Sequence, residues 1–415
     1  MRPFTWGTVT ATGPLRVKLD GDTTALPVTL DSLVIPESLF VGDRVYCGLA
    51  NKRVIIHGRS GGERLLAGPR LFDLRPALAT AGKGVWYSDL NPADSNPYAP
   101  LHGWRLVSGE VMLFGLIRTL TAVNVGDVLF RLPDELWPLT SKPFFTEYNN
   151  NVARVVVNID GTVTAGSAMS SGVYLDFAGV AYNNNAGLAR HAMVLNSAQG
   201  WQPYGAPYGP PAYVADDGYG RRFWEGVVKG GAMGTTIASL AANPGIVSGV
   251  GATHLMAQPE STGFSRMDAN TGGLTRATIS GGLATSAQMS LDARILTDAY
   301  AAAATPVYFV SGSNYNASAW ASAVVSRMGD GAIKLAGLVI ANVAGSVFAR
   351  IPISMAPKHQ LLWFVESTDG IGRVDVKPDG SIILSVGSTA SGNFNSFESL
   401  QWMPAETWDR YWGRL

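Results

Sequence analysis

The sequence predicts an all-β protein: a small N-terminal OB-like barrel, a linker and three tandem β-sandwich repeats. Three observations support this prediction. Runs of Val, Thr, Ile and aromatic residues are separated by Gly, Pro, Asn and Asp, which is the spacing of strands and turns. Helical periodicity is scarce. One pattern of strands and turns recurs three times along the chain.

Residues 1–60 are expected to form the barrel. Residues 15–20 alternate apolar and polar side chains before an Asp-Gly turn, and residues 41–47 and 53–58 predict a later hairpin. About five short strands in ~60 residues suit a closed barrel, because closure removes exposed sheet edges. A unit of this size is marginally stable alone, so we expect it to dock against another protein.

Residues 61–108 are expected to be a connector. They contain several Gly and Pro residues and little periodicity. A short helix is predicted within them, at residues 71–79.

The internal repeat is most evident in a strand that begins with Arg and leads into a glycine turn. It reads RVVVNIDG from Arg154 and RVDVKPDG from Arg373, with a weaker copy, RMDANTGG, from Arg266. The Arg-to-Gly distance is 7 in all three copies. An Asp-Gly pair between alternating strands predicts a hairpin, because the turn needs a positive φ that Gly tolerates.

Upstream of this strand, each copy has an apolar run interrupted by one glycine: Gly115, Gly226 and Gly337. A glycine inside a strand indicates a bulge or a close backbone approach. The copies are longer than solenoid repeats, and each is long enough to have its own core. We therefore expect sandwich repeats at residues 109–200, 201–310 and 311–415.

The composition excludes several classes of protein. The chain has 415 residues, with 47% hydrophobic and 15% charged, and its 31 basic and 31 acidic residues give no net charge. A neutral chain is not expected to bind nucleic acid, because such proteins carry a positive excess. The single cysteine, Cys47, excludes intrachain disulfides. No signal peptide or membrane span is recognisable, so we expect synthesis in the cytoplasm and no membrane insertion.

No catalytic, cofactor or metal site is predicted. The five histidines are far apart, with no Cys or carboxylate at metal-ligand spacing. The G-x-S-x-G string at residues 58–62 lacks the helix that follows a nucleophile, and the glycine-rich residues 229–236 lack a phosphate-binding Lys-Ser/Thr ending. Asp216 and Asp217 would suit a glycosidase only if both faced one substrate, and sequence neighbours point in different directions.

Aromatic clusters are the better lead to a binding surface. Exposed rings can stack on sugars and dominate the energetics of interfaces. The candidates for glycan or interface contact are Trp201, Tyr204, Tyr208, Tyr213, Tyr219, Trp402, Trp408, Tyr411 and Trp412. Packing at domain junctions or subunit interfaces is the alternative interpretation. Two Asn triplets, at residues 149–151 and 183–185, are expected to form turns that could also contact a ligand.

Part of the chain resembles a known family. Residues 8–28 (TVTATGPLRVKLDGDTTALPV), residues 41–45 (VGDRV) and the strand at residues 54–58 resemble the N-terminal module of minor tail proteins of phages infecting actinobacteria. The three later units resemble the β-sandwich repeats of tail-fibre and tail-tip proteins. The middle unit departs most, because its Asp-Gly has become Gly272-Gly273.

The resemblance implies a structural virion protein of the distal tail. The OB-like barrel, residues 1–60, would attach to other tail-tip proteins, and the sandwiches would contact the host surface, with cell-wall glycan as the expected ligand. It also implies a homotrimer and offers no catalytic motif or cofactor. Two alternatives stay open: a tail enzyme that degrades glycan, and an architectural component without host contact.

Overall fold

A computed structural model shows that strands dominate the chain and that helices are short, so the predicted all-β class is confirmed. The chain divides into two compact units, Met1–Arg70 and Leu71–Leu415, called here the barrel unit and the body. The structure describes residues 4–12, 15–26, 31–32, 44–50, 53–59, 68–87, 98–149, 151–232, 234–239, 241–243, 252–257, 264–270, 273–277, 288–310, 313–315, 323–341, 344–367, 370–387, 389, 394–398 and 400–412.

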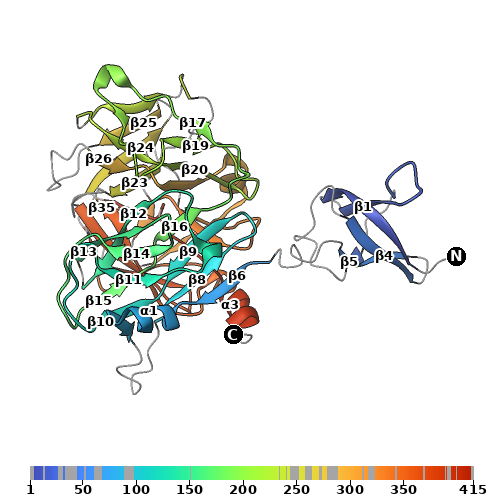
Figure 1. The fold of residues 1–415 in the computed structure, drawn as a ribbon, viewed down its shortest axis with the longest axis horizontal. Coiled ribbons are helices and arrows are strands. Elements are labelled where there is room, and N and C mark those ends of the chain that lie inside the picture. Colours follow the sequence, from blue (N-terminus) through green and yellow to red (C-terminus); the bar gives the residue numbers. More distant parts are fainter. Residues whose placement is uncertain are drawn as a thin grey trace. The chain divides into compact units, whose positions relative to one another are not determined.

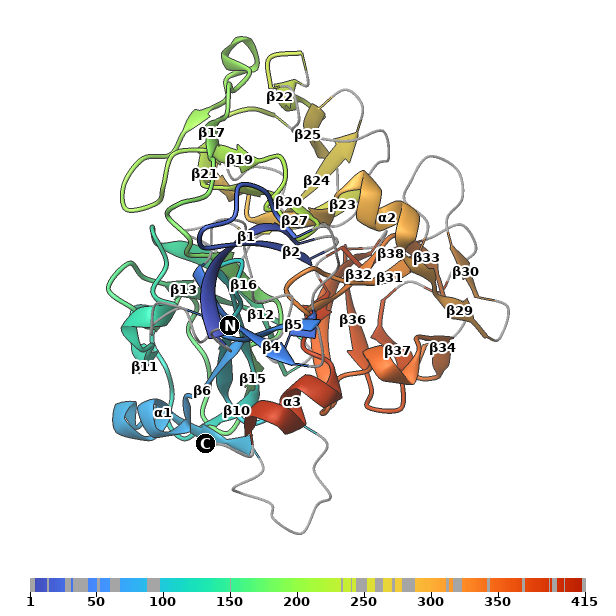
Figure 2. The same cartoon turned by 90° about the vertical axis from the view of Figure 1, so that its right-hand side faces the viewer.

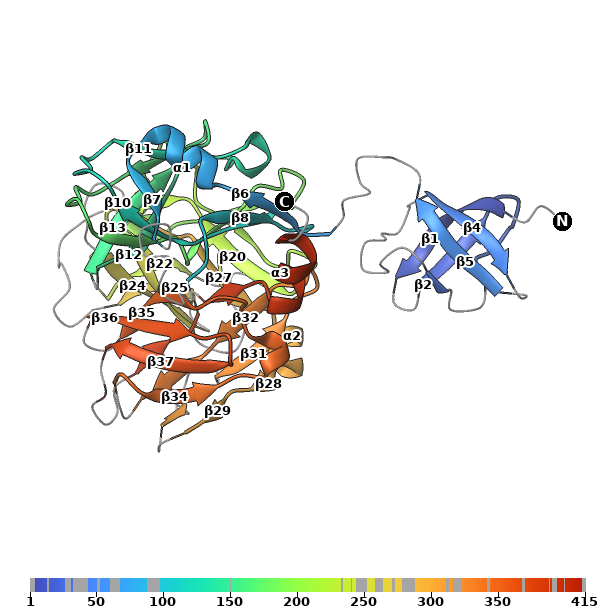
Figure 3. The same ribbon diagram turned by 90° about the horizontal axis from the view of Figure 1, so that it is seen from below.

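The barrel unit is a five-stranded sheet. Its strands are β1 (Phe4–Thr12), β2 (Leu15–Leu19), β3 (Asp31–Ser32), β4 (Arg44–Ala50) and β5 (Arg53–Arg59). They lie in the order β2-β1-β4-β5-β3, and β3 runs parallel to β5 while the other pairs are antiparallel. Register shifts in β1 and in the β4–β5 pair increase the coiling of these strands. This arrangement is OB-like, as predicted (Figure 3).

The core of the barrel unit is small. Its buried side chains alternate with outward ones along the strands: Val9, Leu15, Val17, Val45, Cys47 and Ile56. A Cβ on Gly7 would lie 2.5 Å from Cγ1 of Val17, so the close packing of β1 on β2 requires glycine there. Burial also raises the pKa of the Cys47 thiol to about 11, which keeps it protonated and unreactive.

The body consists of three consecutive segments. The first has β6 (Arg70–Asp73), α1 (Arg75–Ala81), β7 (Gly84–Trp86), β8 (His102–Arg105), β9 (Glu110–Phe114), β10 (Leu116–Thr119), β11 (Val128–Arg131), β12 (Lys142–Tyr148), β13 (Asn151–Val157), β14 (Thr162–Ala165), β15 (Tyr174–Asp176) and β16 (Val180–Asn183). The second has β17 (His191–Ala192), β18 (Gln202–Pro203), β19 (Ala212–Val214), β20 (Arg221–Glu225), β21 (Val227–Lys229), β22 (Thr236–Ser239), β23 (Ala252–Ala257), β24 (Phe264–Asn270), β25 (Gly273–Ala277), β26 (Gln288–Ser290), β27 (Ala293–Leu296) and α2 (Asp298–Ala303).

The third segment is built in the same way. It has β28 (Thr305–Pro306), β29 (Tyr308–Phe309), β30 (Asn314–Tyr315), β31 (Val324–Arg327), β32 (Ile333–Ala336), β33 (Leu338–Ile340), β34 (Val347–Arg350), β35 (Leu361–Ser367), β36 (Gly370–Val376), β37 (Ser381–Val386), β38 (Asn395–Ser396), β39 (Gln401–Trp402) and α3 (Ala405–Trp412). Figure 2 shows the three segments as a blue-green, a yellow-green and an orange-red lobe.

Each segment has one four-stranded sheet with the same strand order. These sheets are β16-β9-β8-β6, β27-β20-β19-β17 and β39-β32-β31-β28. The longer sheets correspond as well: β11-β14-β13-β12-β15-β10 in the first segment and β34-β37-β36-β35-β38-β33 in the third. In the second segment the same order is divided between β22-β25-β24-β23 and β26-β21. The segments begin at β6, β17 and β28, so part of the expected connector, residues 70–87 and 98–108, belongs to the first segment.

Two of the three strand glycines, Gly115 and Gly226, are sites of close backbone approach, as expected. Gly115, Gly226 and Gly337 have φ values of 120°, 99° and 101°. Their carbonyls accept hydrogen bonds from the N–H groups of Phe177, Leu291 and Phe397, at 3.2, 2.8 and 2.9 Å. A Cβ on Gly115 would lie 2.5 Å from the backbone of Leu101. A Cβ on Gly226 would lie 2.7 Å from the Pro210 carbonyl, so a side chain at either position would separate two neighbouring stretches of chain.

The Asp-Gly turns also form as expected. Gly161 and Gly380 both have a φ of 79°. Asp160 accepts a hydrogen bond from the N–H of Thr162 at 3.0 Å, and Asp379 accepts one from that of Ser381 at 2.9 Å. Residues 271 and 272 of the middle turn lie outside the described residues.

The segments share buried surface. Along β9, Val111 and Leu113 pack into the core of the first segment. Met112 and Phe114, on the opposite face, join a core that includes Leu335 of the third segment. A strand buried on both faces reads as a continuous apolar run. The three segments therefore form one compact unit and not separate domains in series.

Candidate functional site

Two of the predicted aromatic residues form a half-exposed pair beside a lysine. The rings of Tyr204 and Tyr208 meet edge to face with centroids 5.5 Å apart. The pairing of β18 with β21 sets Gln202 opposite Lys229, and the Lys229 Nζ lies 5.9 Å from the centre of the Tyr204 ring. Gln202 is exposed beside them. We call Tyr204, Tyr208 and Lys229 the tyrosine–lysine site.

The loop that carries this site is held between two segments. Tyr208 forms a β-bridge with Ser141, which directly precedes β12 of the first segment. A Cβ on Gly209 would lie 2.9 Å from Cγ2 of Thr140, so the loop packs tightly there. The tyrosine–lysine site therefore has a supported backbone, which lowers the entropy lost when a ligand binds.

The other predicted aromatic residues of the second segment are buried or half-buried. Trp201 and Tyr213 are buried, and the indole N–H of Trp201 donates to Oγ1 of Thr235 at 3.1 Å. Tyr219 is half-buried, and its carbonyl accepts a hydrogen bond from the N–H of Gly329 in the third segment at 2.9 Å. These three residues take part in the core and in a joint between segments.

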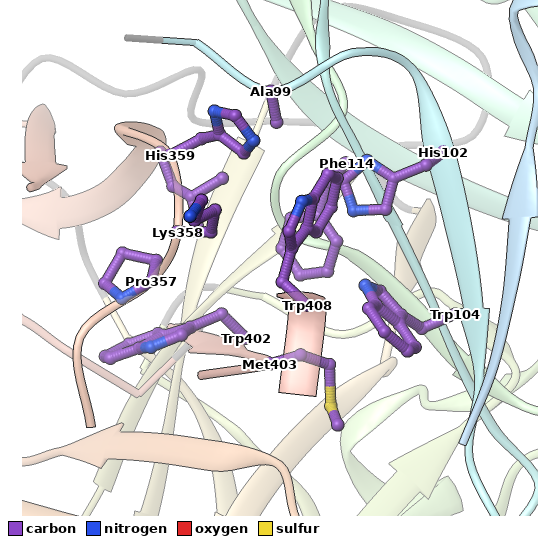
Figure 4. A pocket seen from close by; sticks show the side chains of 11 residues that line it. Ala99, His102, Trp104, Phe114, Pro357, Lys358, His359, Trp402, Met403 and Trp408 are labelled. Atoms are coloured by element: carbon purple, nitrogen blue, oxygen red, sulfur yellow. The ribbon is translucent and has the colours of Figure 1, made fainter. Parts of the chain in front are cut away.

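Two of the C-terminal aromatic residues, Trp402 and Trp408, line a small pocket between the third and first segments (Figure 4). Trp408 of α3 lies against two histidine rings, at centroid distances of 4.5 Å from His102 and 4.8 Å from His359. Trp402, also buried, lines the same pocket. His102 contacts the carbonyl of Pro100 at 2.7 Å, and burial lowers its pKa to about 3, so the imidazole is neutral at pH 7.

The remaining C-terminal rings extend this contact. Trp412 stacks on Trp408 with centroids 4.6 Å apart, and the Arg75 guanidinium lies 5.3 Å from the centre of the Trp412 ring. Tyr411 meets Trp104 edge to face at 5.9 Å. Trp408, Tyr411 and Trp412 thus connect α3 to the first segment, while Trp402 of β39 packs on Trp363 within the third segment, which is the packing interpretation of this cluster.

The barrel unit has an aromatic pair that sequence reasoning missed. Trp6 and Tyr46 are directly opposite in the β1–β4 ladder, with ring centroids 5.2 Å apart. They are 39% and 37% exposed. Strand alternation could have identified Trp6, because it shares the outward face of β1 with Thr8 and Thr10 while Val9 points inward.

The two aspartates weighed as a glycosidase pair have different surroundings. Asp217 is buried and binds Arg221 through its Oδ2, 2.8 Å from Nε. Asp216 is exposed and caps the N–H of Gly218 at 2.8 Å.

In the Asn triplet at residues 183–185, the Asn183 amide is buried and donates to the Ser108 carbonyl at 3.1 Å, so it stabilises a turn.

Carboxylates do converge between the first and third segments. Glu147, Asp176 and Asp375 are buried, and burial raises the pKa of Asp176 to about 8. Arg373 makes a two-point contact with Asp375, at 2.8 and 3.0 Å, and lies 3.7 Å from Glu147. The Tyr174 hydroxyl donates to Glu147 at 3.1 Å. The contacts of Glu147 and Asp375 resemble those of a structural ion-pair network.

No family model, curated protein or solved structure matches this chain. Within the described residues, no group of three or more His, Cys, Asp or Glu side chains is placed to hold a metal ion. Among those same residues, no helix is long and apolar enough to cross a membrane.

Proposed function

We propose that this chain is a structural protein of a phage tail that attaches the tail to the host surface. The observation that carries the proposal is that the residues resembling minor tail proteins fold as a compact unit of their own, Met1–Arg70, apart from a much larger all-β body. A tail anchor and a host-contacting body are different tasks. Two compact units allow each surface to suit its own partner.

The barrel unit would bind its neighbour in the tail through Trp6 and Tyr46. Large aromatic side chains supply much of the binding energy at protein interfaces. This pair is exposed on strands that the barrel holds rigid, so little side-chain freedom remains to be lost on docking. The partner is another protein of the tail tip.

The body would bind host cell-wall glycan through the tyrosine–lysine site. The Tyr204 and Tyr208 rings offer apolar faces for the C–H face of a sugar, and the Lys229 ammonium can donate hydrogen bonds to hydroxyl or acidic groups. A single site of this kind binds weakly. Several copies on one virion would raise the apparent affinity through effective concentration.

Two pairs of substitutions test the two surfaces separately. Trp6→Ala with Tyr46→Ala should reduce incorporation into virions, detected with an antibody to the body, while the purified protein still binds host cell wall. Tyr204→Ala with Tyr208→Ala should reduce binding to host cell wall and leave incorporation into virions unchanged. Tyr308→Ala is the matched control, because this tyrosine is 68% exposed elsewhere on the body. Virions that incorporate the Trp6/Tyr46 variant normally and adsorb normally with the Tyr204/Tyr208 variant would contradict the proposal.

A glycan-degrading enzyme is the second candidate, favoured by the raised pKa of Asp176 close to Glu147. A protonated carboxylic acid beside a carboxylate is the pairing that glycoside hydrolysis uses. The test is incubation with host cell wall followed by analysis of soluble sugars. Release of oligosaccharide that is lost in Asp176→Asn, with binding unchanged, would favour the enzyme over the attachment protein.

A further inference from the structure

We infer that the body is a single-chain counterpart of a homotrimer: its three segments are repeats closed around a pseudo-threefold axis, and one copy of the chain forms the working particle. This inference does not depend on the proposed function. Three repeats of one chain take the place that three identical subunits have in a homotrimer.

The repeats correspond residue by residue. In the hairpins β12–β13, β23–β24 and β35–β36, the arginines noted in the sequence occupy the same ladder position. Arg154 is paired with Phe145, Arg266 with Leu255, and Arg373 with Phe364. The strand glycines and their hydrogen bonds correspond in the same way. Equivalent registers across three sheets indicate copies of one unit.

The contacts between repeats form a closed ring. The equivalent strands β12, β23 and β35 each contact the other two, and they lie together in the middle of the body (Figure 1). Three sandwiches in a row would leave the first and third apart. Mutual contact of three equivalent strands requires an arrangement around a common axis.

A buried polar junction joins one residue from each repeat. Ser108 precedes β9, Arg221 begins β20, and Asp330 precedes β32. The Ser108 hydroxyl donates to Asp330 at 2.6 Å, and Arg221 Nη2 donates to the Ser108 hydroxyl at 2.8 Å and also pairs with Asp330. All three are buried, with Arg221 fully enclosed.

The chemistry of this junction favours one chain over three. In a homotrimer, an axis would bring three copies of the same side chain together. Three arginines or three aspartates buried side by side would repel one another strongly in a medium of low dielectric constant. A single chain can place a hydroxyl, a cation and an anion there, and these three groups bind one another.

Two of the joints between repeats have further contacts of their own. Lys142 of the first repeat pairs with Glu225 and Asp292 of the second, at 3.3 and 2.8 Å. Arg373 of the third repeat lies 3.7 Å from Glu147 of the first. The aromatic contacts of α3 with β8 add to the joint between the third and first repeats. The particle therefore carries one barrel unit and one tyrosine–lysine site for every three repeats.

Mass measurement of the purified full chain over a range of concentrations tests the stoichiometry. We expect the mass of one chain, 43.9 kDa, in native mass spectrometry and in light scattering. A stable particle of three chains would overturn the inference. Neither measurement involves virions or glycan, so this result is independent of the tests of the proposed function.

Cleavage between repeats tests the closure. A protease site inserted between Ala186 and Gly187, both exposed, divides the first repeat from the second. After cutting, the two fragments should stay in one particle and separate only in denaturant, like a noncovalent complex. The uncut protein with the same insertion is the control. Fragments that separate in native buffer would show that the repeats do not form a closed ring.

Discussion

The body encloses charged side chains that the described part of the barrel unit keeps at its surface, although the body has exposed ion pairs as well. The barrel unit has a small apolar core, and its ion pair between Arg44 and Asp20 is exposed. The body buries Arg221, which pairs with Asp217 of the same segment and with Asp330 of the third segment. The small β unit keeps this ion pair in contact with water, whereas segments that cover one another enclose charges, and an enclosed charge is costly unless it is paired.

The largest expected effect is the loss of the buried cation in the body. Arg221→Met leaves Asp217 and Asp330 enclosed without their partner, so the free energy of unfolding should fall by about 3–5 kcal/mol. Chemical denaturation followed by tryptophan fluorescence measures it. The matched variant is Asp20→Asn in the barrel unit, whose exposed ion pair should leave stability unchanged within error. Equal effects of the two substitutions would break the comparison.

The next effect concerns the independence of the barrel unit. Ile56 is fully buried in its core, and Ile56→Ala should destabilise that unit by about 2–5 kcal/mol. Scanning calorimetry should show a lower melting temperature for the barrel transition and an unchanged transition for the body. A single transition that shifts as a whole would mean that the two units unfold together.

A third effect depends on pH and belongs to the body alone. Because the pKa of His102 is about 3 in the folded state, the unfolded chain binds a proton more readily below its ordinary value of 6.5. The free energy of unfolding therefore falls as pH falls from 6.5 toward 3, and the loss due to His102 is about 2 kcal/mol at pH 5. His102→Phe should remove this acid sensitivity in denaturation curves measured across the range.

Asp176 provides the control of opposite sign. Its raised pKa, about 8, means that the folded protein holds the proton and the unfolded protein releases it above its ordinary value of 3.8. Stability from Asp176 is present below pH 3.8 and is lost as pH rises through 8. Asp176→Asn should therefore remove a loss of stability that develops as pH rises from 3.8 to 8, while His102→Phe removes a loss that develops as pH falls from 6.5 to 3.

The smallest of the four effects is at a hairpin turn. Gly161 has a φ of 79°, and an added Cβ would lie 2.0 Å from Trp137 Nε1. Gly161→Ala should cost at least the ~1–2 kcal/mol of a left-handed residue, since it adds a steric clash. Gly126 has a φ of 88° and no atom within 4 Å of an added Cβ, so Gly126→Ala measures the backbone cost alone. Chemical denaturation gives the free energy of unfolding of both variants, and their difference is the cost of the steric clash at Gly161.

Local patterns predicted much of the fold. The alternation along residues 15–20, the Asp-Gly turns after Arg154 and Arg373, and the strand glycines each depend on a few neighbouring residues, and each forms as expected. The short helix expected at residues 71–79 forms at α1, Arg75–Ala81, whereas residues 71–73 belong to strand β6. These features follow from backbone sterics and strand periodicity, which act within a few residues.

The sites were less accessible to such reasoning. The nine aromatic candidates included Tyr204 and Tyr208, which are half-exposed, and also Trp201 and Trp402, which are buried. Composition cannot distinguish an exposed aromatic residue from a buried one, because the exposure of a ring depends on which distant strand covers it. Trp6 was missed since a single tryptophan in a short strand forms a surface only with its cross-strand neighbour, Tyr46.

The sequence by itself determined an all-β chain with a small OB-like barrel and a recurring strand-and-turn unit, because period-two alternation and positive-φ glycines are local constraints. Only the tertiary structure decided how the segments meet. The apolar run of β9 showed that both faces needed cover, yet nothing local indicates that Leu335, more than 200 residues later, lies in the same core. Residues share a core because they are close in the folded structure, and their separation along the sequence does not indicate that closeness.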